Sequence, residues 1–385
     1  MPRWIQISGW VGVVLQLWNP LLGQCVLIWS AMDQYQELQH KAAGHDGTLT
    51  DSEGLLVFKP TVRQEVDFYK AAQQKYFAKG EDDALSDEGH GYEVSLAVWM
   101  PTFLGILEEG LREGTKARIS NANNVDFADF ELGTIESSSD LNGNSESRAG
   151  SKCFIVLENL LKNFVKPNVL DIKLGKVLYD ETASDEKRDT LTQVSANTTS
   201  GSLGIRICGM KLQKNQLTDQ FDESHYQIDD NDRDYVFVNK QFGRSCKDSE
   251  VEQAFNAFFA NDNLTETRQR QLKEIFLQRL QLFYNTLLDE EVRMISSSLL
   301  FIYEGDTDRW DELNDEDRIL KDDFIDDSDN EDGSDDEAEN RSRSLLSSMS
   351  LIDFAHSKFL PGKGYDENVV VGVESVMSIF ENLTK

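Results

Sequence analysis

The sequence has little cysteine, little histidine and few positive charges for its length, and each shortage argues against a class of protein. Its four cysteines show no C-x-x-C pair or other ligand spacing, so neither a zinc site nor a disulfide framework is predicted, and reduced intracellular thiols are expected. Lys and Arg number 38 against 69 Asp and Glu. Because phosphate groups attract cations, this balance argues against general binding to nucleic acids or anionic membranes, and a polyanionic substrate would need a local basic pocket.

Long apolar runs are also scarce. Residues 4–29 form the only one, and Asn19-Pro20 interrupts it. A signal or membrane anchor, a buried helix and an extension upstream of the functional domain all fit this run. The composition switches abruptly at Met32, so we expect residues 1–31 to be an apolar N-terminal extension outside the functional domain, with Met32 as the true start. Stable membrane insertion is not expected, because no other stretch is long enough to span a bilayer.

The most unusual feature of the composition is one acidic tract. From Asp306 to Glu339 there are 18 acidic and 3 basic residues, a net charge of −15 out of −31 for the whole chain. Its few apolar side chains cannot offset chain entropy and charge repulsion, so we expect a disordered acidic insertion over residues 306–346. Two roles fit the tract: a solubilising linker, or a docking surface for basic DNA-binding or chromatin proteins.

A more specific signal is KPNVLDIKLG, residues 166–175. As a β-strand, its period of two places Asp171 and Lys173 together on the face opposite three apolar side chains. Pro167 can begin such a strand, and Gly175 after it lets another group approach the backbone closely. An isolated D-x-K pattern is most simply an ion pair on a half-buried strand, whereas the complete motif from Pro167 to Gly175 is much rarer.

Two other motifs suit a nucleotide and its metal. Asp353 stands between Ile352 and Phe354 in a predicted strand, and an acid in such apolar surroundings is costly to bury unless a cation meets it. A nucleotide-bound Mg²⁺ is one such cation. Lys59 ends a predicted strand and Glu65 lies at the start of a predicted helix, an arrangement that can grip nucleotide phosphates. A surface ion pair is the simpler explanation of that spacing alone.

The rest of the chain carries ordinary helix and strand patterns. Hydrophobic periodicity and turn residues predict strands over residues 97–105, 153–157, 235–238 and 297–304, helices over 264–295 and 366–383, and mobile loops over 77–91 and 117–150.

Taken together, the motifs resemble those of the inositol polyphosphate kinase family, and most of all its fungal multikinases. The specific matches are the Asp171 motif, the Ser298-Leu299-Leu300 element and the Ile-Asp-Phe-Ala-His run that ends at His356. Protein kinases fit less well, because the chain lacks the G-x-G-x-x-G and H-R-D motifs. The resemblance implies a two-lobed α+β fold, similar to protein kinases and ATP-grasp proteins, with antiparallel sheets and packed helices. Residues 32–160 would form the ATP-binding lobe and 161–385 the catalytic, inositol-phosphate-binding lobe.

The resemblance also implies an activity. The expected reaction is ATP-dependent, Mg²⁺-assisted phosphorylation of inositol 1,4,5-trisphosphate to the tetrakis- and pentakisphosphates, with higher inositol phosphates as further substrates. A monomer in the nucleus and cytoplasm is expected. One alternative is a phosphoinositide lipid kinase, which would accept phosphatidylinositol bisphosphate. The other is a transcription or chromatin adaptor that works through the acidic tract, with kinase activity secondary or absent.

On the nucleotide side, the resemblance assigns roles to five residues. Lys59 would hold the ATP phosphates, and Glu158 and Leu160 would meet the adenine at a linker between the lobes. Asp171 would contact the ribose, and Asp353 would bind Mg²⁺.

On the substrate side, Lys173 would lie beside the reacting hydroxyl and the migrating phosphoryl group, which makes Asp171 and Lys173 the expected catalytic pair. Lys187, Arg188 and His356 are assigned to the substrate by the same resemblance.

Removing residues 322–339 would separate the kinase from the adaptor hypothesis. A kinase should keep its turnover in vitro, because no residue assigned to nucleotide or substrate lies in this tract. An adaptor should lose its basic partner. The measurement is phosphorylation of inositol 1,4,5-trisphosphate by the deletion variant and by the full chain, with histone capture assayed in parallel; lost turnover would contradict the kinase expectation.

Overall fold

The computed structural model describes residues 13–19, 24–30, 36–38, 47–83, 94–108, 153–222, 224–229, 232–321 and 345–385. The chain divides into two compact units. The first contains the described residues within 1–38, 45–77 and 103–159, and the second those within 39–44, 78–102 and 160–385.

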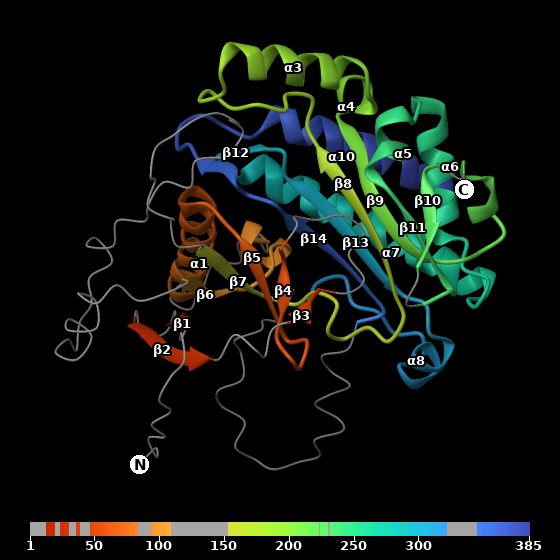
Figure 1. The fold of residues 1–385 in the computed structure, drawn as a ribbon, viewed down its shortest axis with the longest axis horizontal. Coiled ribbons are helices and arrows are strands. Elements are labelled where there is room, and N and C mark those ends of the chain that lie inside the picture. Colours follow the sequence, from red (N-terminus) through yellow and green to blue (C-terminus); the bar gives the residue numbers. More distant parts are fainter. Residues whose placement is uncertain are drawn as a thin grey trace, which may run out of the picture. The chain divides into compact units, whose positions relative to one another are not determined.

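The first unit is built on a seven-stranded antiparallel sheet with the strand order β2-β1-β6-β7-β5-β4-β3 (Figure 1). Its strands are β1 (Val13–Asn19), β2 (Gln24–Ser30), β3 (Gln36–Glu37), β4 (Leu49–Thr50), β5 (Leu56–Pro60), β6 (Phe103–Glu108) and β7 (Cys153–Glu158). Helix α1 (Arg63–Asp83) follows β5. Phe58, Leu107 and Val156 form the buried centre of the sheet's apolar cluster.

Two strands lie within the predicted N-terminal extension. β1 and β2 pair with each other, and β1 also pairs with β6 at the edge of the first unit's sheet. The extension was expected to lie apart from the functional domain, and this pairing was not anticipated. The proposed start at Met32 lies outside the described residues and stays a prediction.

The segment before β6 differs from the strand predicted over residues 97–105. Leu96–Trp99 is a 3-10 helix, and the strand begins only at Phe103. The Ser95 side chain accepts a hydrogen bond from the backbone N–H of Ala97 and caps the helix. Pro101 disfavours helical backbone at the preceding residue and so ends the helix before the strand.

The second unit contains a six-stranded antiparallel sheet with the order β10-β11-β9-β8-β13-β14, and a two-stranded sheet of β12 and β15. The strands are β8 (Pro167–Leu174), β9 (Ile205–Gln213), β10 (Tyr226–Ile228), β11 (Tyr235–Val238), β12 (Val292–Ile295), β13 (Ser298–Glu304), β14 (Ser347–Ile352) and β15 (His356–Phe359). The predicted class, antiparallel sheets with packed helices, is confirmed.

The described helices of the second unit are η2 (Leu96–Trp99), α3 (Asp185–Ala196), α4 (Thr199–Leu203), η4 (Thr218–Gln220), α5 (Lys240–Ser245), α6 (Asp248–Phe259), α7 (Glu266–Asp289), α8 (Thr307–Glu312) and α10 (Glu367–Leu383). α10 packs against α7 and against strands β8 and β9 (Figure 1). Among the described helices, none combines the length and the apolar character needed to cross a bilayer.

Aromatic rings form the core between these helices and the sheet. Phe301 of β13 stacks on Phe380 of α10 with ring centroids 5.8 Å apart. Phe255, Phe259 and Phe276 pack around this pair. The long amphipathic helix predicted over residues 264–295 is found as α7, with its apolar face in the core, but the predicted end was wrong: the helix stops at Asp289 and residues 292–295 form β12. This packing holds β8, the strand of the Asp171 motif, in the middle of a rigid sheet.

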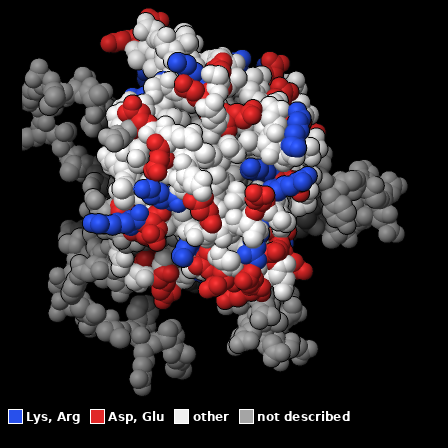
Figure 2. Space-filling view, turned by 90° about the vertical axis from the view of Figure 1, so that its right-hand side faces the viewer, with Lys and Arg blue, Asp and Glu red and all other residues white. Residues whose placement is uncertain are grey.

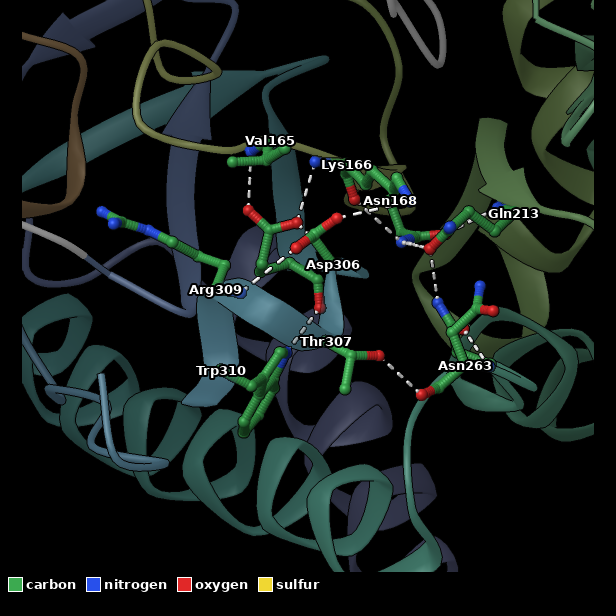
Figure 3. Close-up of polar contacts among 11 residues, drawn as sticks. Val165, Lys166, Asn168, Gln213, Asn263, Asp306, Thr307, Arg309 and Trp310 are labelled. Atoms are coloured by element: carbon green, nitrogen blue, oxygen red, sulfur yellow. Dashed lines mark hydrogen bonds and ion pairs between the residues drawn. The ribbon is translucent and has the colours of Figure 1, made fainter. Parts of the chain in front are cut away.

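The start of β8 is fixed by a buried polar network (Figure 3). The Glu304 carboxylate accepts hydrogen bonds from the backbone N–H groups of Val165 and Lys166 at 2.6 and 2.8 Å. Next along the strand, the Asn168 side chain accepts from the backbone N–H of Gln213 at 2.6 Å and donates to its side-chain oxygen at 3.1 Å. These contacts satisfy buried polar groups that would otherwise weaken the sheet.

The acidic insertion begins later than predicted. Residues 306–321 are folded: Trp310 of α8 is buried and its indole N–H donates to the Glu304 carbonyl at 2.8 Å. Arg268 of α7 pairs with Asp311 and Asp315. The predicted boundary at residue 306 was wrong because cations on α7, distant in sequence, neutralise these acids. Residues 322–344 lie outside the described residues, and the disorder and docking roles predicted for them stay predictions.

On the face drawn in Figure 2, Lys and Arg side chains are interspersed with Asp and Glu and form no continuous basic surface.

Arg279 of α7 binds the two chain segments that flank residues 322–344. Its guanidinium is 2% exposed and donates to the Ile319 carbonyl at 2.8 Å and to the Ser347 hydroxyl at 2.6 Å. The buried Asp317 carboxylate lies 3.5 Å from the guanidinium and accepts from the backbone N–H groups of Leu346 and Ser347. A buried cation thus holds together chain segments on either side of residues 322–344.

Arg279→Ala should destabilise the protein by about 3–5 kcal/mol, because it leaves the Asp317 charge buried and unpaired. Arg270→Ala is the matched control: Arg270 lies on the same helix, in an exposed pair with Glu274, and its loss should change stability by less than about 0.5 kcal/mol. Urea unfolding followed by circular dichroism measures both. Equal midpoints for the two variants would contradict this account of Arg279.

Candidate active site

Two site residues come from the C-terminal half of β8, which lies between β9 and β13 in the sheet. Asp171 lies opposite Leu300 on β13 and Gly209 on β9. Lys173 lies opposite Ser298 and Arg206 on the same neighbours. The predicted strand is confirmed, and its period of two places Asp171 and Lys173 on one face.

The register of β8 against β9 shifts just beside Asp171. Asp171 pairs with Gly209 and Ile172 with Ile207, so Cys208 is the extra residue of a bulge. Bulges recur next to active sites, where they re-aim side chains. Burial, with an added contribution from the Asp171 charge, raises the pKa of the Cys208 thiol to about 12. Cys208 is therefore a neutral thiol beside the carboxylate.

Asp171 is a buried acid with an unsatisfied oxygen. The residue is 4% exposed, and its Oδ1 has no hydrogen-bond partner among the described residues. Burial raises its pKa to about 7, the negative charge of Asp353 adds to the rise, and the Lys173 ammonium opposes it. Without a ligand, Asp171 therefore holds a proton over much of the range in which an ordinary aspartate is ionised.

Asp353 occupies the connection between β14 and β15 rather than the strand that was predicted for it. Its φ of 68° lies in the left-handed region, which aspartate tolerates better than most residues. The prediction was wrong because β14 ends at Ile352, where the backbone turns. Backbone in this conformation is held by its surroundings and is concentrated at functional sites.

Lys173 is held by the backbone opposite it. Its ammonium donates to the Ser296 carbonyl at 2.8 Å. Ser296 itself has a φ of 64° and lies just before β13. One of the three ammonium donors is thereby used to aim the side chain. Sequence reasoning did not single out Ser296, although the three consecutive serines before Leu299 mark a turn.

The two carboxylates suit a hard divalent cation. Asp353 is close enough to Asp171 to disfavour the ionisation of Asp171, which also offers an unpartnered oxygen. Among the described residues, no group of three or more His, Cys, Asp or Glu side chains could form a metal cage. Mg²⁺ is commonly held by one or two carboxylates, with phosphate oxygens and water completing its shell. The donor set therefore fits a cation that arrives with a nucleotide.

In the first unit, Lys59 and Glu65 form the strand-to-helix ion pair that the sequence suggested. The Lys59 ammonium lies 2.7 Å from Glu65 Oε1, and the two side chains are 12% and 2% exposed. The Thr61 hydroxyl donates to the second carboxylate oxygen at 2.9 Å. The pair is thus largely buried, unlike an ordinary surface ion pair. Asp171, Lys173 and Asp353 belong to the second unit.

The predicted linker residues lie on either side of the division between the units. Glu158 ends β7 in the first unit. Asn159 donates from its backbone N–H to the Leu55 carbonyl at 2.9 Å, and the division follows it. Leu160 begins the second unit's segment and packs against the buried pair Val169 and Ile302.

The three predicted substrate contacts lie in different surroundings. Lys187 is exposed in the first turn of α3. Arg188 is turned toward its own chain: its guanidinium donates to the Ala183 and Glu181 carbonyls at 2.9 and 2.6 Å. Arg188 therefore supports the loop before α3, and its substrate contact stays a prediction. His356 begins β15, and its Nδ1 lies 2.6 Å from a carboxylate oxygen of Asp180.

Two groups near the site were missed by sequence reasoning. Arg206 on β9 has a buried Nη1 without a hydrogen-bond partner among the described residues, and burial together with the charge of Arg244 lowers its pKa. Alternation along β9 would have revealed that Arg206 shares a face with Cys208. No local sequence pattern marks Asp180 as a site residue, because its partner His356 lies 176 positions away in the sequence.

Asp171→Asn should stabilise the ligand-free protein at high pH. The folded-state pKa of about 7 exceeds the ordinary aspartate pKa of 3.8, so the folded chain binds more protons than the unfolded chain between these values. The free energy of unfolding of the wild type therefore falls by a few kcal/mol as the pH rises through this window. The variant does not lose this stability, because asparagine does not ionise. Thermal unfolding in chelator should give a higher Tm for the variant at pH 8 and nearly equal values at pH 4. A less stable variant at pH 8 would contradict the burial argument.

Comparisons with known proteins agree with this geometry. A family model for inositol polyphosphate kinase matches residues 154–381. The chain is 51% identical over 362 residues to the inositol polyphosphate multikinase of Saccharomyces cerevisiae, covering 91% of this chain and 98% of that protein. It is 27% identical over 350 residues to the inositol polyphosphate multikinase of Schizosaccharomyces pombe, covering 90% and 96%.

A solved structure shows the same fold. The crystal structure of the inositol phosphate multikinase Ipk2 from S. cerevisiae, in complex with ADP and Mn²⁺, matches with a TM-score of 0.64 and 45% identity, covering 86% of this chain and 100% of that one. The chain therefore belongs to the inositol polyphosphate kinase family and is a kinase.

Proposed function

We propose that this kinase is a multikinase that transfers the γ-phosphoryl group of Mg²⁺-bound ATP to ring hydroxyls of inositol 1,4,5-trisphosphate, yielding the tetrakis- and pentakisphosphates. The observation that carries the proposal is the meeting of Asp171, Lys173 and Asp353 at one end of the second unit's sheet. The 51% identity to the S. cerevisiae multikinase supports the substrate class.

Asp353, with Asp171 beside it, is proposed to hold the nucleotide's Mg²⁺, which neutralises charge on the phosphates when bound. The unpartnered Oδ1 of Asp171 and its repulsion with Asp353 support this, because a cation would satisfy the oxygen and cancel the repulsion. Binding of the cation would displace the proton that Asp171 holds near neutral pH. The ribose contact expected for Asp171 remains a proposal from the family resemblance.

Lys173 is proposed to stabilise the migrating phosphoryl group. Its ammonium is anchored on the Ser296 carbonyl, so two further N–H donors remain for the anionic oxygens of the transition state. Phosphoryl transfer requires little covalent help from the protein, and rate comes from positioning and charge stabilisation. A lysine held in place before the reaction loses little free energy to reorganisation.

Lys59 is proposed to bind ATP phosphates. Its ion pair with the buried Glu65 fixes the ammonium and supports the assignment. Glu158 and Leu160 are proposed to meet the adenine, because a strand that exits into a linker can offer backbone hydrogen-bonding groups there. Lys187 is proposed to contact substrate phosphates, for which a cationic donor is suited, and His356 is proposed to contact a hydroxyl of the substrate's inositol ring.

The test of the proposed function is direct. Pure protein would be incubated with Mg-ATP and a panel of inositol phosphates, and the product isomers resolved by chromatography. Phosphorylation of inositol 1,4,5-trisphosphate at more than one hydroxyl is the expected result. Phosphatidylinositol 4,5-bisphosphate in micelles belongs in the same panel, and turnover on that lipid alone would replace the proposal with a lipid kinase.

Lys173→Ala should lower turnover on inositol 1,4,5-trisphosphate by a factor on the order of 10² to 10³, as for other groups that stabilise developing charge. Lys162→Ala is the control, since Lys162 is an exposed lysine with no proposed contact to nucleotide or substrate. Initial rates at saturating ATP measure both variants. Near wild-type turnover of Lys173→Ala would refute the assigned role.

A further inference from the structure

A hydrogen bond and an ion pair join the loop after β8 to strand β15. His356 and Lys358, two residues apart on β15, pair with the consecutive acids Asp180 and Glu181. His356 lies opposite Ile295 on β12, and the next residue, Ser296, carries the carbonyl that holds Lys173. His356 also follows Asp353 by three residues. The pair of His356 with Asp180 is therefore adjacent to the candidate active site.

The two pairs differ in burial and in bonding. Asp180 is 12% exposed in its pair, whereas Glu181 is 66% exposed. The Asp180 carboxylate is fixed from both sides: its Oδ1 accepts from the backbone N–H and the hydroxyl of Thr182 at 2.9 and 2.6 Å, and its Oδ2 meets His356 Nδ1 at 2.6 Å. Burial alone would raise the pKa of Asp180, but the hydrogen bonds from Thr182 and His356 outweigh it and lower the pKa below its usual value.

This geometry selects one state of the imidazole. An ionised carboxylate only accepts hydrogen bonds, so the His356 Nδ1 must carry a hydrogen. The other ring nitrogen, Nε2, is then left for a ligand, and the hydrogen bond at Nδ1 sets its protonation state and direction. His356 is 45% exposed, so a ligand can reach the ring.

We propose that Asp180 is a positioning residue of phosphoryl transfer: held by Thr182, it fixes the tautomer and orientation of His356 so that the Nε2 lone pair accepts a hydrogen bond from a hydroxyl of the inositol phosphate. The inference rests on the proposed function, because it takes His356 as a substrate contact. Asp180 touches neither nucleotide nor substrate and acts through the imidazole.

The Asp180→Asn variant tests the tautomer because Thr182 dictates how the amide is oriented. The backbone N–H of Thr182 can only donate, so the amide oxygen stays beside Thr182 and the amide NH₂ faces His356. That NH₂ needs a lone pair on Nδ1, which moves the ring hydrogen to Nε2. A single substitution that preserves size thereby reverses the tautomer.

The first measurement needs no substrate. Ring nitrogen spectra of the full chain labelled with ¹⁵N-histidine would be recorded, with the His356 signals assigned by their absence in His356→Ala. The neutral ring should carry its hydrogen on Nδ1 in the wild type and in Glu181→Gln, and on Nε2 in Asp180→Asn. An unchanged tautomer in Asp180→Asn would overturn the inference, whatever the enzyme's activity.

The second measurement is kinetic. Asp180→Asn should lower kcat/KM for inositol 1,4,5-trisphosphate by about 10- to 100-fold, as loss of a carboxylate partner does for other functional histidines. KM for ATP should stay unchanged. Glu181→Gln is the matched control: it removes the neighbouring carboxylate of the same loop and should leave kcat/KM within about twofold, as expected for an exposed pair.

A double-mutant cycle separates positioning from support of the loop. Asp180→Asn should have no further effect in a His356→Ala background, since the residue it orients is gone. An equal loss in both backgrounds, or no loss in either, would overturn the inference. A wild-type enzyme inactive on every inositol phosphate would instead refute the proposed function, and the spectra would still report whether Asp180 sets the tautomer.

Discussion

The repulsion between two carboxylates at one end of a sheet sets the chemistry of the candidate site in the second unit. Asp171 is 4% exposed, carries an unpartnered oxygen and faces the charge of Asp353, an arrangement that disfavours the ionised, ligand-free state. A cation accompanied by phosphates relieves it. The sheet tolerates this unfavourable group because β8 is paired on both sides and its helices share an aromatic core. The proposed affinity for a metal nucleotide and the raised pKa of Asp171 would thus have the same physical cause.

Several chain connections converge at this end of the sheet. The antiparallel register places the end of β8, the start of β9, the start of β13 and the end of β14 together. Four residues here have a positive φ: Gly175, Gly204, Ser296 and Asp353. Such backbone persists only where its surroundings determine it, and here it presents the carbonyl that aims Lys173 and the Asp353 carboxylate. The loop after β8 is fixed separately, by Arg188 and by the pair of Asp180 with His356.

Sequence reasoning predicted well wherever the relevant interactions are local. Alternation along residues 167–174 identified the face of Asp171 and Lys173, and a 3.6-residue period identified α7. It failed where the structure of a segment depends on partners that are distant in sequence. Residues 306–321 have the composition of a disordered tract, yet Arg268 and Arg279 on α7 neutralise their acids from 38 to 47 positions away. Two other strand predictions also failed: the backbone turns at Asp353, and the adjacent Ser95 cap and Pro101 favour a 3-10 helix at Leu96–Trp99.

By itself, the sequence determined the motifs, their order along the chain, the alternation that exposes them and therefore the family. Only the tertiary structure decided that Asp171 and Asp353 share a site, that Asp171 retains a proton, that Arg188 is turned toward its own loop and that Asp180 meets His356. The reason is physical. Periodicity is set by neighbours a few residues apart, whereas ion pairing, burial and pKa depend on distances in space between groups that the sequence separates by as many as 182 positions.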